Sequence, residues 1–113
     1  MSVAVQKLSL DALARTQLAA ARAASSGRAA HTVYGGHEHV LRQTLIALAA
    51  GHSLAEHDSP GEASLQVLSG RIRLVAGVDV WDGRTGDLII IPPARHSLEA
   101  VEDAAVLLTV ANG

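Results

Sequence analysis

From residue 40 onward, the chain is a series of short apolar runs separated by turn residues. Gly, Pro, Asp and Ser gather between the runs, as in DSPG at 58–61 and DGRTG at 82–86. Short strands with frequent turns, and few helical stretches between them, favour an all-β sandwich or barrel over βαβ units. The strands are expected near residues 40–48, 53–57, 63–69, 71–76, 78–82, 87–91, 96–100 and 104–110.

Residues 8–25 have a different pattern, because they contain neither Gly nor Pro and their apolar residues recur at helical spacing. Ser9 is a candidate N-cap, and Gly27 is a candidate C-terminal stop. We predict an amphipathic helix that packs on the domain or on a dimer partner. Residues 26–39 are either a loop or an edge strand. The chain is thus divided into an N-terminal helical segment, 1–27, and a β-barrel domain, 28–113, which together form a single domain.

Composition excludes several classes of function. The 113 residues carry a net charge of −2 and only 2% aromatic side chains, so binding of nucleic acid by this domain alone is not expected. The absence of Cys excludes disulfides, thiolate metal sites and Cys nucleophiles. No apolar run approaches the roughly 20 residues that span a bilayer, and the N-terminus does not resemble a secretory signal. We therefore expect a cytoplasmic protein without a membrane partner.

Two glycine-led motifs stand in the β region. Gly51 is followed by five residues and then His57, and Gly70 closes that stretch. Gly86 is followed by five residues and then Pro92, with a histidine soon after in GDLIIIPPARH. This order resembles the two motifs of the cupin superfamily over about residues 40–110, and the chain is similar to short single-domain bacterial cupins of unassigned function. The resemblance implies a small antiparallel jelly-roll barrel, preceded here by the N-terminal α-helix, and a homodimer.

The first motif departs from the family pattern at its metal ligands. The family's second histidine falls on Ser59, and its glutamate falls on Ala63 or Ser64. In the second motif, His96 arrives one residue early, and no amide stands at the final asparagine position. At most two of the four ligands that the resemblance implies therefore remain, His57 and His96. In the resembled fold these two positions face one cavity.

Other residues could complete a site. His37 and His39, in HEH, would share one face of a strand, and either could then add a metal ligand. The alternative is that HEH is the solvated start of a strand. Arg42 and Gln43 interrupt an apolar run, so one of them should face inward, where it could hold an anionic ligand. An outward Arg42 is the other interpretation.

Three hypotheses of function follow. In the first, a small molecule is bound or sensed in a barrel pocket anchored by His57 and His96. In the second, a dioxygenase-type or isomerase-type enzyme holds Fe, Mn, Ni, Cu or Zn through these two histidines and His37 or His39. In the third, the chain is a dimeric structural or regulatory interaction module. The missing carboxylate places the first hypothesis above the second, because it removes the anionic ligand. No catalytic residue is identified.

Overall fold

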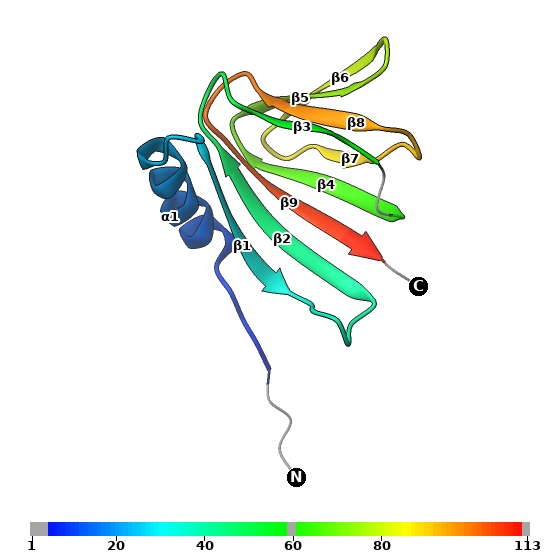
Figure 1. The fold of residues 1–113 in the computed structure, drawn as a ribbon. Helices are drawn as coiled ribbons and strands as arrows, with labels where there is room; N and C mark the ends of the chain where they lie inside the picture. The colour runs from blue at the N-terminus through cyan, green and yellow to red at the C-terminus, as the bar shows by residue number, and fades with distance from the viewer. Residues whose placement is uncertain (1–4, 59–60, 112–113) are drawn as a thin grey trace.

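The computed structural model describes residues 5–58 and 61–111, in which two antiparallel β-sheets face each other and one helix lies outside them (Figure 1). The five-stranded sheet has the order β1-β2-β9-β4-β7, and the four-stranded sheet has the order β3-β8-β5-β6. This architecture confirms the predicted jelly roll with an N-terminal helix. The elements are α1 (Leu10–Ala23), β1 (Arg28–Tyr34), β2 (Leu41–Leu48), β3 (Ser53–His57), β4 (Glu62–Ser69), β5 (Arg71–Ala76), β6 (Asp79–Arg84), β7 (Leu88–Ile90), β8 (His96–Ala100) and β9 (Ala104–Ala111).

The helix α1 begins at its predicted cap and covers the outside of the five-stranded sheet. The Ser9 side chain accepts a hydrogen bond from the backbone N–H of Ala12 at 3.2 Å. Ala14 packs against Leu45 of β2 and Ala105 of β9, so the helix rests on this domain. Within the described residues, no helix is long and apolar enough to cross a membrane.

The segment before β2 contains an edge strand, β1, followed by a turn. β1 pairs with β2 alone and so forms one border of the five-stranded sheet. At the opposite border lies β7, which pairs with β4 over three residues. Residues 28–34 are thus the predicted edge strand, whereas residues 35–39 lie in the turn that leads to β2.

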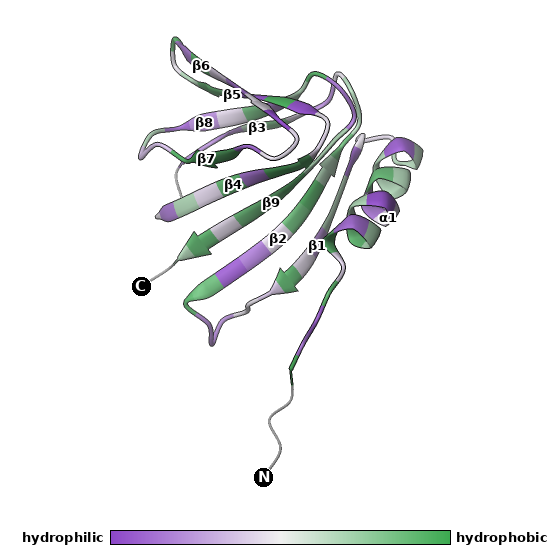
Figure 2. Ribbon diagram, turned by 180° about the vertical axis from the view of Figure 1, so that it is seen from behind, coloured by the Kyte–Doolittle hydropathy of each residue, from purple (hydrophilic) through white to green (hydrophobic). Residues whose placement is uncertain are grey.

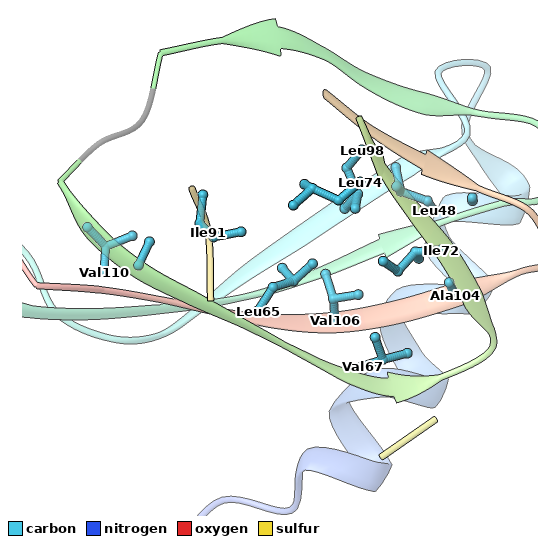
Figure 3. Packing of buried hydrophobic residues seen from close by; sticks show 12 residues of the cluster. Leu48, Leu65, Val67, Ile72, Leu74, Ile91, Leu98, Ala104, Val106 and Val110 are labelled. Carbon is cyan, nitrogen blue, oxygen red and sulfur yellow. The ribbon is translucent and has the colours of Figure 1, made fainter. Parts of the chain in front are cut away.

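The core lies between the two sheets and is built mainly from alternate residues of β2, β4, β5, β8 and β9. Leu65, Val67 and Val106 come from the five-stranded sheet, and they face Leu74 and Leu98 of the other sheet (Figure 3). The packing is aliphatic because the chain has no Phe. Each fully buried Leu or Val contributes about 1.5–3 kcal/mol relative to an exposed one.

We call the end of the barrel beside the helix, with the turns at 49–52, 69–71 and 101–103, the helix end. Asp103 ties this end together: it accepts hydrogen bonds from the backbone N–H of Ala50 at 2.8 Å and from Arg22 Nε of α1 at 2.6 Å. The bond from Ala50, followed by the Arg22 interaction, lowers the pKa of the Asp103 carboxyl. Gly70 lies so close to the carbonyl of Asp103 that no Cβ fits there. Backbone and side-chain contacts therefore join three turns and the helix.

The only tryptophan of the chain, Trp81, lies on β6 at the border of the four-stranded sheet. It stands opposite Leu74 of β5 in the strand register. Opposed residues of antiparallel strands point to the same face, so Trp81 faces inward like Leu74, although it is 41% exposed. The partial exposure follows from its place at the border of the sheet.

Candidate functional site

The two histidines of the sequence motifs lie side by side at the other end of the barrel. His57 ends β3 and His96 begins β8, and they are partners in the register across a β-bulge. Their ring centroids are 4.5 Å apart, with an edge-to-face angle of 61°. His96 is buried, whereas His57 is exposed. We call this end, with residues 57–58, 61 and 92–96, the histidine end.

Each imidazole is held by a backbone carbonyl two residues earlier. His57 Nδ1 lies 3.0 Å from the carbonyl oxygen of Ala55, and His96 Nδ1 lies 2.8 Å from that of Ala94. A carbonyl oxygen only accepts, so Nδ1 of each ring carries the proton. In the neutral rings, Nε2 of each histidine is therefore the hydrogen-bond acceptor or base. The pair presents two acceptors in fixed orientations.

The two histidines border a small cavity inside the barrel. Its volume is about 30 Å³, and apart from the histidines its walls are aliphatic: Ile46, Leu54, Leu65, Leu74, Ile91, Leu98 and Leu108. A cavity of this kind needs roughly 10–15 Å³ to hold one water molecule, so there is space for one small polar group. A pocket for a drug-sized ligand has roughly 300–1,000 Å³, and the interior is far below that.

Wider hollows lie at the mouth of the barrel. One of about 500 Å³ shares Ile91 with the inner cavity and extends past Pro93 to Ser64 and Thr109 on the outer face of the five-stranded sheet. A second of about 590 Å³ lies along Asp58, Glu62 and Arg95. A ligand with one narrow end could therefore place that end in the inner cavity and its body in the mouth.

Ion pairs join the residues next to the two histidines in sequence. The sequence analysis did not predict this network. Arg95, which precedes His96, binds Glu56 Oε1 through Nε at 3.0 Å and Asp58 Oδ1 through Nη1 at 3.2 Å. The hydrogen bond to Glu56, and then the charge of Asp58, raise the pKa of Arg95. All three side chains are exposed, which limits their contribution to stability. The sequence signal was the opposite charge of the residues flanking the two histidines.

The HEH histidines do not share a strand face, so that expectation is wrong. β2 begins at Leu41, and His37 and His39 lie in the turn that precedes it. His39 Nδ1 contacts Tyr34 OH at 3.3 Å, and both residues are exposed. The β1–β2 turn also lies far below the β3–β8 pair in two opposite views (Figures 1 and 2).

Arg42 and Gln43 point to opposite faces of β2. Gln43 lies on the outer face, where its Nε2 donates to Thr109 Oγ1 at 3.3 Å. Arg42 is in register with Val110, a core residue of β9, and so lies on the inner face at the mouth. Neither residue lines the small cavity, whose walls begin four residues further along β2, at Ile46.

The described residues do not fit a metal held by three protein ligands. Ala63, at the family's glutamate position, is buried in the core, while Ser64 points to the other face of β4. Ser59, at the second-histidine position, lies outside the described residues. Among the residues that the structure describes, no three His, Asp or Glu side chains form a group that could hold a metal ion. His57 and His96 alone provide fewer protein ligands than a stable first-row metal site commonly uses.

The chain resembles several solved protein structures. No protein-family model matches the chain, and no curated protein matches it. Among solved structures, a conserved protein of unknown function from Streptococcus pyogenes is 26% identical, with a TM-score of 0.70 over 80% of this chain and 78% of that one.

Two further solved structures are also similar. An RmlC-like cupin protein from Desulfovibrio desulfuricans is 26% identical, with a TM-score of 0.66 over 75% of this chain and 82% of that one. A mutant of the salicylate 1,2-dioxygenase from Pseudoaminobacter salicylatoxidans, in complex with gentisate, is 20% identical, with a TM-score of 0.75 over 88% of this chain and 32% of that one. The glycine-led motifs, the jelly roll and these structural neighbours together place the chain in the cupin superfamily.

Proposed function

We propose that the protein binds a small organic molecule at the histidine end and takes one hydrogen-bond-donating group, a hydroxyl or an amine, between His57 and His96. The observation that carries the proposal is the orientation of the two rings. Both Nδ1 atoms are held by carbonyls, so both Nε2 atoms are free to accept from a ligand beside an aliphatic cavity of about 30 Å³. The cavity admits the donor group and the mouth holds the rest of the molecule.

A pair of isomers tests this proposal. 1-Hexanol and 1-methoxypentane have the same atoms, but only the alcohol donates a hydrogen bond. We expect 1-hexanol to shift the imidazole ¹⁵N resonances of His57 and His96 in an NMR titration, and 1-methoxypentane to bind about tenfold more weakly. Equal binding of the two isomers, or no shift with either, would overturn the proposal.

Two substitutions localise the effect. His57→Gln removes an exposed imidazole and should leave the unfolding midpoint unchanged while it weakens 1-hexanol binding. His31→Gln is the matched control, because His31 is also exposed and lies on the edge strand β1. If the control weakens binding as much as His57→Gln does, the alcohol binds elsewhere.

The metal-dependent enzyme remains a separate hypothesis that the site does not favour. Two imidazoles without a third protein ligand should retain a transition metal only weakly. We expect untagged protein to contain much less than one equivalent of Fe, Mn, Ni, Cu or Zn by elemental mass spectrometry. Near-stoichiometric metal that disappears in the His57→Ala, His96→Ala double variant would instead favour the enzyme.

A further inference from the structure

Arg42 extends the inner face of the barrel toward the mouth. It lies four residues from Ile46 on the same face of β2, about 13 Å along the strand. Its register partner Val110 lies opposite Ala63 of β4, and both are core residues. Figure 2 shows a hydrophilic stretch near the start of β2, next to the mainly apolar β9. A cation therefore stands at the outer end of the inner face, separated from Ile46 by Thr44 on β2 and next to the apolar Leu108 and Val110 of β9.

The aliphatic stem of Arg42 packs closely against the backbone of Gly35. Gly35 follows β1 with φ +119°, and a Cβ built there would approach Cα and Cγ of Arg42 to 2.9 Å. The aliphatic stem of Arg42 thus lies in the space that the missing side chain leaves. Only a glycine combines this backbone conformation with so close an approach.

The charge of Arg42 is uncompensated within the described part of the chain. No carboxylate of these residues lies within ion-pair distance of it, whereas Arg95 at the same end is paired with Glu56 and Asp58. A guanidinium offers five N–H donors in a planar fork that suits a carboxylate. The mouth thus presents one set of donors, and the histidine pair presents two acceptors.

We infer that the ligand is an elongated carboxylate with a hydroxyl or amino group at its far end. This inference rests on the proposed function, because the far group is the donor between His57 and His96. The carboxylate would accept from Arg42, and the apolar middle of the ligand would lie along Leu108 and Val110 of β9. Such a molecule would offer an acceptor to Arg42 and a donor to the histidine pair, whereas a neutral alcohol offers only the donor.

6-Hydroxyhexanoate and 6-hydroxyhexanamide separate the charge from the rest of the ligand. The two probes have the same length and the same terminal hydroxyl, but only the first is an anion. We expect 6-hydroxyhexanoate to bind the intact protein about tenfold more tightly by NMR titration, because a hydrogen bond to a charged group is stronger than a neutral one. Arg42→Gln should reduce its affinity to that of the amide.

Arg84→Gln is the matched control, since it removes the same charge from β6, where Arg84 is in register with Arg71. The control should retain the full preference for the anion. Equal affinity of the two probes, or an Arg42→Gln variant that keeps the preference, overturns the inference. If the His57 and His96 imidazoles still shift in that case, the proposed function stands without it; if they do not shift with either probe, both fail.

Discussion

At the helix end, the Asp103 carboxylate binds the turn at Ala50 and Arg22 of α1, and the carbonyl of Asp103 lies directly against Gly70. At the histidine end, the polar side chains are mostly exposed, and the two imidazoles border an unfilled cavity. Both ends close the same two sheets. Substitutions should therefore change stability at the helix end and ligand binding at the histidine end, and the following variants test that division.

The largest effect is expected for Gly70→Ala at the helix end. Gly70 has φ +83°, and a Cβ would collide with the carbonyl oxygen of Asp103. We expect the free energy of unfolding, measured by urea denaturation, to fall by about 2–4 kcal/mol. The control is Gly77→Ala, with φ +62° and nothing within 4 Å, which should cost about 1 kcal/mol. Equal losses in the two variants would show that the contact with Asp103 is unimportant.

A smaller effect is expected for Asp103→Asn. The Asp103 side chain is 34% exposed, so loss of its charge-assisted hydrogen bonds should lower the free energy of unfolding by about 1 kcal/mol at pH 7. The pKa of Asp103 is lowered in the folded state, so its contribution is fully present above the ordinary value of 3.8 and is lost as pH falls through the folded value.

The pH dependence provides a second readout for the same variant. The difference in stability between the native protein and Asp103→Asn should be constant near neutral pH and should shrink below about pH 4, because the native carboxyl then becomes protonated. Urea denaturation at pH 7 and pH 3 measures both values. A difference that is the same at both pH values would mean that the carboxylate charge contributes nothing.

The smallest effect on stability is expected for Arg95→Gln at the histidine end. The ion pairs of Arg95 with Glu56 and Asp58 join exposed side chains, where solvent and salt weaken the attraction. We expect the unfolding midpoint to stay within experimental error of the native value, and 1 M NaCl to erase any remaining difference. A loss as large as that of Gly70→Ala would contradict the proposed division between the two ends.

The strands and the helix could be predicted because their signals are local. Alternation of apolar residues and the placement of Gly and Pro determine where strands begin and end, and the observed bounds of α1 and β2–β9 differ from the predicted ones by at most two residues. The edge strand β1 fills only residues 28–34 of the range 26–39. HEH was misplaced because its polar spacing of two also suits a strand. Only the pairing of β1 with β2 shows that the turn includes His37 and His39.

The site could be predicted only in part. Alternation required that Arg42 and Gln43 face opposite ways, but the register with Val110 was needed to show which one faces inward. The motif spacing pointed to His57 and His96, whereas the size of the cavity beside them depends on aliphatic side chains from six strands and from the segment after β7. Such packing is a property of the assembled barrel.

The border position of Trp81 has a practical consequence. The chain contains one Trp, one Tyr and no Phe, so its intrinsic fluorescence excited at 295 nm (roughly the red edge of indole absorption) comes from this single side chain. Trp81 faces inward beside Leu74, which lines the histidine cavity, and is partly exposed to solvent. The emission maximum of Trp81 should therefore shift when water or a ligand enters the barrel interior, so binding can be followed without an attached dye.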